Sequence, residues 1–409
     1  MKLNIESATP PTPHPFALFQ LGFRPFFLGA LLYSVISIVI WTLAYSLQWQ
    51  ISPLIRFENP FWWHGHEMIF GYALAVVSGF LLTASKNWTG VQTIRFIPLA
   101  ALFSLWLIAR ILPWIGAVPL EVAAGVDLLF SLLLVIAVTH PLYMSRQWGQ
   151  VRIFTSKLSL IFMANLVFYL GLFDIIEWGE RFGIYAGVYL IIALLLTLGR
   201  RVYPSFIENG VGVSLGLKNS KFLDLSSLFL LLFFAIVDLA MPHHWISGIL
   251  AALLVLVHGV RFYNWYSHLI WSKPLVWVLM VGYGWIITGF LLTALATLLP
   301  YIGVNSISHF IALHAFTYGA IGIITSGMMA RVSLGHTGRN IFEPPNSLHW
   351  IFGLLLGGSI ARVILPLFLP EQVITFILIS QLLWIISFAL FCIEYIPLLI
   401  KPRVDNRPG

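Results

Sequence analysis

Histidines cluster in two places among otherwise apolar residues of this chain. The two clusters are WWHGHEM at positions 62–68 and HFIALH at positions 309–314. Imidazole is a common ligand of iron, copper and zinc. A polar side chain in a membrane-embedded segment is costly unless it has a partner. We therefore expect a bound metal or haem, held by residues drawn from His64, His66, His309 and His314.

The composition places the chain among integral membrane proteins. Hydrophobic residues make up 59% of the 409 residues and charged residues 9%, and the mean hydropathy is +0.93, values far from those of soluble proteins. Apolar runs long enough to cross a bilayer as helices predict an all-α integral membrane bundle. It forms one polytopic domain, 1–409, which includes an N-terminal cytoplasmic segment, 1–21, and a C-terminal cytoplasmic tail, 400–409. About twelve helices are predicted, at 22–48, 64–84, 96–112, 118–140, 154–173, 182–199, 223–241, 244–262, 274–298, 309–330, 348–369 and 372–399.

Lysine and arginine are distributed unevenly between the connections. If the N-terminus lies inside, the even-numbered connections and the termini hold all of them except Arg56, Arg110, Arg181 and Arg362. Short loops rich in these residues stay in the cytoplasm, so both termini are predicted to be cytoplasmic, and 200–221 is predicted to be a cytoplasmic loop. The net charge of +7 then reflects topology, and no nucleic-acid partner is expected.

The remaining unusual residues narrow the chemistry. No removable signal peptide is expected, because the first apolar run is too long and lacks a small-residue cleavage site. The single cysteine, Cys392, excludes an intramolecular disulfide and a cysteine metal cluster. Among the charges inside predicted helices, Asp127 is expected to pair with Arg110, whereas Arg362 has no evident partner in the sequence.

The two histidine clusters are expected at the same depth. Both helices that carry them run from the outside inward, and at about 1.5 Å per residue their imidazoles lie within the outermost few turns. His66 and His314 are therefore predicted to clamp a haem iron or to share a copper ion. His309 lies about 140° around the helix from His314 and is the weaker candidate. Glu67 shares a helix face with His64 and is expected to orient an imidazole.

The same residues have a simpler interpretation. Histidines at helix ends, together with Trp62 and Trp63, also occur in the polar-aromatic belts that membrane proteins place at the bilayer surface. The belt is the better interpretation of one isolated histidine. The metal is the better interpretation of a matched set.

An internal repeat connects the two clusters. Without gaps, the segment around His66 can be laid on the segment around His314, so that the second and tenth helices resemble copies from three four-helix repeats or from an irregular duplication. Chance is the alternative, since glycine, serine and aromatic residues are common in membrane helices. The matched pairs are Phe70 with Tyr318, Gly71 with Gly319, Ser78 with Ser326, Gly79 with Gly327, Thr89 with Thr337 and Gly90 with Gly338.

Two further candidate sites are expected toward the inner leaflet. His258 and Met280 sit at similar depth on successive helices and are predicted to ligate a second haem, although core or lipid packing is the alternative for Met280. In RVSLGHTGR, Arg331, His336 and Arg339 surround two glycines. That pattern suits an anion, either haem propionates or a small oxyanion, or equally a positively charged anchor on the cytoplasmic side.

Longer blocks of the sequence resemble the NnrS family. They are LGFRPFFL at 21–28, WHGHEMIFGYALAVVSGFLLTASKNWTG at 63–90, LWLIAR at 105–110, GRRVYPSF at 199–206 and HAFTYGAIGIITSGMMARVSLGHTGR at 314–339. The resemblance implies a bacterial inner-membrane protein that carries haem, expected to be of the b type, and copper, linked to nitric oxide stress and denitrification. The family often has a histidine where this chain has Met280. Its motifs fall here on His64, His66, His314, His336, Arg331 and Arg339.

A looser parallel concerns the plan of the helices. Haem-copper oxidases and nitric oxide reductases also have twelve helices, with haem ligands on the second and tenth. His243 and His244, between the seventh and eighth helices, resemble their paired copper ligands, although a polar turn explains the pair equally well. The sixth helix, 182–199, contains no histidine, so the three-histidine metal site of those enzymes is not assembled.

Two classes of function follow from the sequence. The first is a haem and copper protein that binds nitric oxide or handles nitrosylated iron, with a redox enzyme similar to nitric oxide reductase as a variant whose electron donor the sequence does not identify. The second is a transporter or channel for a metal or small ion, with polar residues lining a pathway between glycine-rich helices. The scarcity of charge at mid-membrane depth favours the first class.

Overall fold

The computed structural model describes residues 17–51, 54, 56–57, 59–217, 220–305 and 307–405. Within these residues every regular element is helical, and twelve helices are long and apolar enough to cross a membrane. The predicted all-α fold and the count of twelve are confirmed. Of the predicted cytoplasmic charges, Lys2, Lys218 and Arg407 lie outside the described residues.

Six spans make up the N-terminal half. Several combine an α-helix with a π or 3-10 segment. They are α1 (Phe23–Trp41) with η1 (Thr42–Ser46); α3 (Pro60–His66) with η2 (Glu67–Ala73) and α4 (Leu74–Thr89); α5 (Ile97–Ile111) with η3 (Leu112–Trp114); α6 (Leu120–Met144); α7 (Trp148–Gln150) with η4 (Val151–Thr155) and α8 (Ser156–Leu172); and α9 (Gly179–Val211).

The C-terminal half is built in the same way. Its six spans are preceded or interrupted by short segments, among them the 3-10 helix η5 (His268–Ser272) before the ninth. They are α10 (Lys221–Ala240); α11 (Trp245–Trp265); α12 (Pro274–Leu298) with η6 (Leu299–Ile302); α13 (His309–His314) with η7 (Ala315–Gly322) and α14 (Ile323–His336); α15 (Ser347–Ser359) with η8 (Ile360–Ile364) and α16 (Leu365–Phe368); and η9 (Pro370–Gln372) with α17 (Val373–Ile400).

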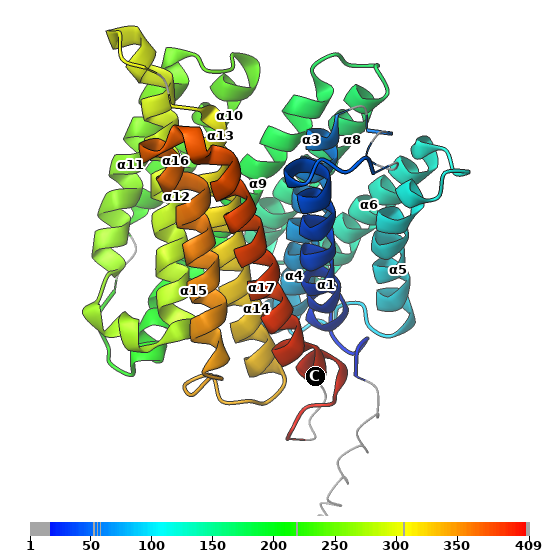
Figure 1. Ribbon diagram of the computed structural model, residues 1–409. Helices are drawn as coiled ribbons and strands as arrows, with labels where there is room; N and C mark the ends of the chain where they lie inside the picture. Colours follow the sequence, from blue (N-terminus) through cyan, green and yellow to red (C-terminus); the bar gives the residue numbers. More distant parts are fainter. Residues whose placement is uncertain are drawn as a thin grey trace, which may run out of the picture.

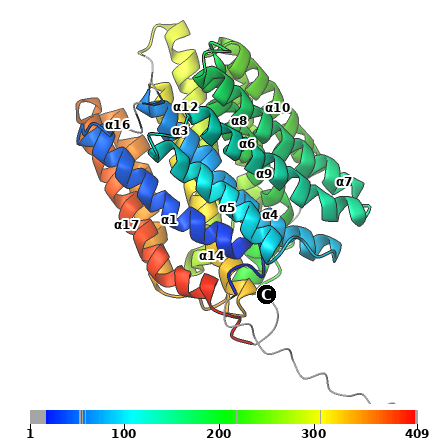
Figure 2. The same ribbon diagram turned by 90° about the vertical axis from the view of Figure 1, so that its right-hand side faces the viewer.

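The spans form a closed bundle with three of them inside. Successive spans pack against each other, and α17 packs against α1, so the last span meets the first (Figures 1 and 2). The second, sixth and tenth spans contact one another across the interior. In their most apolar stretches 89%, 72% and 72% of the residues are buried, against 22% for α10. The spans that carry the histidine clusters are therefore interior helices.

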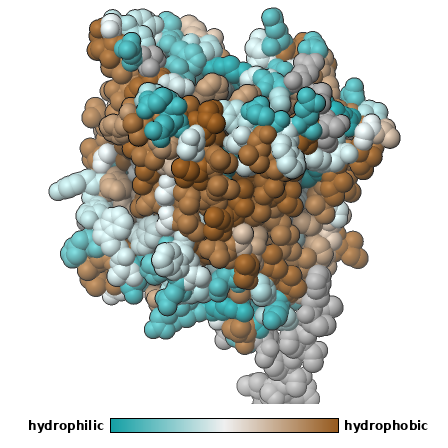
Figure 3. All heavy atoms as spheres, viewed as in Figure 1, coloured by the Kyte–Doolittle hydropathy of each residue, from teal (hydrophilic) through white to brown (hydrophobic). Residues whose placement is uncertain are grey.

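Both ends of the described chain lie on one face of the bundle. The amide of Ala17 donates to the carbonyl of Ile400 at 3.1 Å, and the amide of Val404 donates to the carbonyl of Thr337 at 3.2 Å. We call the opposite face, where α3 and α13 begin, the distal face (top of Figure 1). Hydrophobic side chains form a broad band between the two faces (Figure 3), as expected of a surface that meets lipid.

One predicted boundary is wrong. The segment 200–221 was expected to be a loop, but α9 continues through Arg200 and Arg201 to Val211 and ends at Gly212, which has a φ of 76°. Charged residues do not stop a helix that has left the apolar layer, and Pro204 is accommodated inside this one. Arg200 pairs with Asp224 of α10 at 3.2 Å, which holds the extension against its neighbour.

Four of the π segments lie in the distal half of the bundle, and two of them support the internal repeat. The π segment η2 begins one residue after His66, and η7 begins one residue after His314. Downstream, the hydroxyls of Ser78 and Ser326 each donate to the carbonyl four residues earlier. The two histidines that align in sequence thus occupy equivalent positions in the helices.

Candidate functional site

The side chain of His314 meets that of Arg362 near the distal face. His314 is the last residue of α13, and Arg362 lies within η8. Nη2 of Arg362 lies 3.2 Å from Nε2 of His314, while Nδ1 of His314 lies 2.7 Å from the carbonyl oxygen of Phe310. Because a carbonyl only accepts, Nδ1 carries the proton, and Nε2 presents its lone pair. This tautomer is the one in which a histidine can bind a metal through Nε2.

His64 is the second imidazole of this cluster. Its position is set by the start of α3, where the side chain of Asn59 accepts a hydrogen bond from the amide of Phe61 and Pro60 occupies the first turn. The ring of His64 lies flat on that of Trp41, with centroids 4.5 Å apart and an angle of 2°. Nδ1 of His64 is buried and has no hydrogen-bond partner among the described residues.

The two imidazoles and the guanidinium of Arg362 lie in one region of the bundle. The guanidinium of Arg362 lies within electrostatic range of both imidazoles, and the imidazoles of His64 and His314 lie within range of each other. We call these three side chains with Trp41 the distal cluster. Two donors on α17 contact the adjoining π segments: Gln381 accepts from Ser46 of η1 at 2.6 Å, and the ring of Trp384 packs on that of Tyr318 of η7.

Several polar atoms around the distal cluster lack partners in the described part of the chain. Nε2 of Gln381 and Nε1 of Trp384 are buried N–H donors without an acceptor, in addition to Nδ1 of His64. Buried polar groups are nearly always satisfied in native proteins. Unsatisfied donors and an unsatisfied imidazole in one region are what a bound group with polar edges and a ligand position would complete.

Local helix geometry also converges on the distal cluster. Trp41 immediately precedes η1, His64 lies one turn before η2, His314 immediately precedes η7, and Arg362 lies inside η8. A π segment widens the helix and turns the side chains before and after it to new directions, and such segments are frequent at functional sites. Four of them bordering one cluster indicate that the backbone is adapted to it.

His66 belongs to a different cluster. Its Nδ1 lies 3.0 Å from Oε1 of Glu67, and its Nε2 lies 2.9 Å from Oδ1 of Asn165. The amide orientation of Asn165 is fixed because its nitrogen donates to Oδ2 of Asp127 at 2.8 Å. Both nitrogens of His66 therefore face acceptors, and only an imidazolium donates from both. The structure uses His66 as a buried cation.

Arg110 completes this second cluster. The predicted pairing of Arg110 with Asp127 is confirmed, and Nη1 of Arg110 also donates to Oε2 of Glu67 at 2.8 Å. Two carboxylates thereby face two cations, so the buried charges sum to zero, which a low-dielectric interior favours. Tyr33 donates to Glu67 and Tyr169 donates to Asp127. We call this group the ion-pair cluster; it joins the first five spans.

The structure thus distributes the predicted ligands differently from the sequence analysis. His66 was paired there with His314, but its two ring nitrogens face Glu67 and Asn165. Glu67, which shares a helix face with His64, was expected to orient an imidazole, and the imidazole that it contacts is that of His66. His64 and His66 are two residues apart, so their side chains leave α3 on nearly opposite faces. Metal binding by His66 stays a prediction, and it would require the ring to leave both partners.

His309 contacts His243 on the distal face. The ring centroids are 3.6 Å apart, and His243 reaches this position from the turn before α11 with a φ of 62°. Partial burial and the nearby guanidinium of Arg181 lower the pKa of His243, against the opposing effect of Asp238. His244 has another task, because its Nδ1 accepts the amide of Ile246 and caps α11. The predicted pair of metal ligands is therefore split.

The inner-leaflet candidates are also placed. Nδ1 of His258 lies 2.6 Å from the hydroxyl of Tyr283, and its Nε2 is buried without a partner among the described residues. Met280 is buried on α12, one turn before Tyr283, as expected for core packing. The described contacts do not join Met280 to His258, and ligation of a haem by the two stays a prediction.

The basic segment after the tenth span lies on the face that carries the chain ends. The guanidinium of Arg331 lies 3.9 Å from the centre of the Phe206 ring, and His336 packs on Phe23 with centroids 5.5 Å apart. Arg403 donates to the carbonyl of His336 at 2.9 Å. Burial lowers the pKa of Arg339. The segment is built into the bundle, and anion binding there stays a prediction.

A comparison with protein families decides the relationship that the sequence blocks indicated. The sequence model described as NnrS protein matches residues 17–403. The chain belongs to the NnrS family. Among curated proteins, no match is found. NnrS membership covers nearly the whole chain, so the distal cluster and the ion-pair cluster both lie inside the family's shared region, and the twelve spans make this NnrS protein a multi-pass membrane protein.

Proposed function

We propose that this NnrS protein binds a b-type haem at the distal cluster and takes part in the response to nitric oxide. Family membership supports the role in that response. The observation that carries the haem is the state of the two imidazoles: His314 is held by the Phe310 carbonyl as the tautomer with its lone pair on Nε2, and Nδ1 of His64 is buried without a partner among the described residues. Neutral imidazoles are the ligands that haem iron takes.

The other residues of the distal cluster would position and shield the group. Trp41 fixes the plane of the His64 ring by stacking, and Arg362 places a positive charge beside His314. A guanidinium fork suits a carboxylate such as a haem propionate. Arg362 would therefore give up its contact with the imidazole of His314 and bind the propionate instead. Gln381 and Trp384 supply further N–H donors. The bound iron would supply affinity for nitric oxide or a nitrosyl species.

The finer parts of the proposal follow from charge and spacing. We place the protein in the bacterial inner membrane with both termini in the cytoplasm, since lysines and arginines gather on the face that carries the chain ends. The second, sixth and tenth spans, four apart in order, meet inside the bundle, which supports an arrangement of helices like that of haem-copper oxidases. Copper is proposed at His243 and His309, the two imidazoles in contact on the distal face.

A visible absorption spectrum tests the proposal. The full-length protein, purified in detergent after growth with haem precursor, is expected to show Soret and alpha bands that shift when nitric oxide is added. A protein that is monodisperse and folded but has no such bands would exclude the haem. Bands that do not respond to nitric oxide would retain the haem and exclude binding of the gas.

A further inference from the structure

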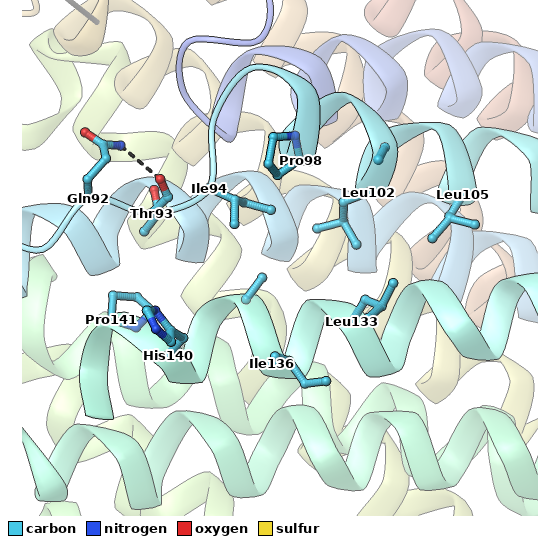
Figure 4. A pocket seen from close by; sticks show the side chains of 12 residues that line it. Gln92, Thr93, Ile94, Pro98, Leu102, Leu105, Leu133, Ile136, His140 and Pro141 are labelled. Carbon is cyan, nitrogen blue, oxygen red and sulfur yellow. Dashed lines mark hydrogen bonds between the residues drawn. The ribbon is translucent and has the colours of Figure 1, made fainter. Parts of the chain in front are cut away.

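A pocket of about 430 Å³ lies between α5 and α6 (Figure 4). The connection after α4 covers one end of it. Both helices are peripheral, since only 33% and 39% of the residues in the most apolar parts of their spans are buried. The pocket is therefore on the lipid-facing side of the bundle, apart from the distal cluster and the ion-pair cluster. Its volume falls in the range of pockets for small molecules.

The lining of the pocket changes from polar to apolar along its length. Gln92, Thr93 and His140 gather at one end, and the wall farther along is formed by leucines such as Leu102 and Leu133 (Figure 4). This distribution matches a ligand with a polar head and an apolar tail. The tail would lie between the helices in the direction of the membrane interior.

The polar end contains a hydroxyl without a partner. Thr93 is 4% exposed, and its Oγ1 makes no hydrogen bond among the described residues. The neighbouring Gln92 donates to the backbone carbonyl of Thr93 at 3.1 Å and does not satisfy the hydroxyl. His140, on α6, lies across the pocket with an exposed ring. Thr93 and His140 thus line the same pocket from opposite sides.

The head that fits this end is uncharged. None of the described residues that line the pocket is Lys, Arg, Asp or Glu. A phospholipid phosphate is normally held by Arg or Lys, so its head would find no counter-charge here. An uncharged ring with carbonyl oxygens would instead accept hydrogen bonds from a hydroxyl and an imidazole on opposite sides.

We propose that this pocket binds a quinone of the membrane. One ring carbonyl accepts a hydrogen bond from Thr93, the opposite oxygen accepts one from His140, and the apolar tail follows α5 and α6. The site is independent of the proposed haem, because the two share no residue.

The test uses the full-length protein in detergent and a benzoquinone with a ten-carbon tail. Saturable binding is expected, and a photoreactive azido form should label peptides covering 92–98 or 133–141. Thr93→Val keeps the shape of the side chain and removes the donor, and His140→Phe keeps a ring. Each is expected to weaken binding roughly three- to tenfold, the effect of one hydrogen bond. Thr288→Val and His268→Phe, outside the pocket, are the matched controls.

Three results would overturn the proposal. Equal affinity for decylbenzene, which has the tail without the carbonyls, would make the pocket an acyl-chain groove. Displacement of the quinone by stoichiometric phosphatidylglycerol would make lipid the occupant. Labelling confined to other peptides would place the quinone elsewhere. If Thr93→Val does not fold, the exposed His140 carries the test through His140→Phe.

Discussion

Nε2 of His314 and Nη2 of Arg362 lie 3.2 Å apart, and the arginine donates to the lone pair that a metal would use. The two residues come from different spans, and each sits at or in a π segment. Arg362 thereby holds the imidazole in the tautomer that binds metal. The contact also sets a condition, because Arg362 must turn away from His314 before any ligand is bound there.

The two histidines of α3 are expected to behave in opposite ways. His64→Ala and His314→Ala should lose the Soret band, because each removes a proposed ligand. His66→Gln should keep it, because the ring of His66 is engaged with Glu67 and Asn165. The spectra of equal amounts of folded protein measure the effect, with the exposed His268→Ala as control. Loss of pigment in His66→Gln and His314→Ala, with the band kept in His64→Ala, would restore the pairing of His66 with His314.

Breaking the ion-pair cluster is expected to destabilise the fold. Asp127→Asn leaves Arg110 and His66 with one carboxylate between them, and removing one member of a buried pair costs about 3–5 kcal/mol. Thermal unfolding in detergent should show a lower midpoint for this variant. Asp174→Asn, at an exposed position between α8 and α9, should change stability by less than about 0.5 kcal/mol.

The outcome of that comparison bears on the charge of His66. If Asp127→Asn and Asp174→Asn unfold at the same temperature, the second carboxylate is not needed, and His66 is a neutral ring. If the midpoint of thermal unfolding falls in Asp127→Asn and rises again when Arg110→Gln is added, the balance of charge stabilises the cluster, rather than the shape of the aspartate.

Copper, if present, should depend on His309 and His243 but not on His244. The first two rings are in contact, whereas His244 is occupied as the cap of α11. Elemental analysis of purified protein should find copper reduced in His243→Ala and His309→Ala. His244→Ala should keep its copper and lose about 1 kcal/mol of stability, the usual value of a helix cap. If His244→Ala loses its copper and His309→Ala keeps it, the ligands are the adjacent residues His243 and His244.

Two glycines on α15 provide a matched test of packing at η7. A Cβ added to Gly358 would collide with the hydroxyl and ring of Tyr318, while one added to Gly353 would meet open space. Gly358→Ala is therefore expected to destabilise by about 1–3 kcal/mol and to disturb the hydrogen bond from Tyr318 to the Ser380 carbonyl. Gly353→Ala should be neutral. Unfolding curves that coincide would contradict this packing.

Much of the fold follows from the sequence, because the length of an apolar run determines a membrane-spanning helix directly. The pairing of Arg110 with Asp127 was also accessible, since opposite charges inside a membrane need each other. The engagement of His66 with Glu67 and Asn165 was not accessible. A regular helix period cannot anticipate the π segments at Glu67 and Ala315, and the partner of His66, Asn165, lies three spans away.

The contact between His243 and His309 on the distal face could not be predicted from the sequence for a similar reason. Sequence proximity favoured His243 with His244, but adjacent residues in a turn point apart, and the ring that His243 meets begins another helix. Unsatisfied atoms such as Nδ1 of His64 and Oγ1 of Thr93 likewise become visible only when every neighbour is known.

The packing of α1 on α17 has a consequence for biosynthesis. Among the twelve described spans, α1 is made first and its neighbour α17 last, so the contact face of α1 stays in lipid or against the insertion machinery until α17 is made. Arg24 illustrates the dependence, since it donates to the carbonyls of Leu399 and Lys401 at 2.8 Å. A chain that ends before residue 373 would contain eleven of the twelve described spans, and the face of α1 that packs on α17 would be uncovered.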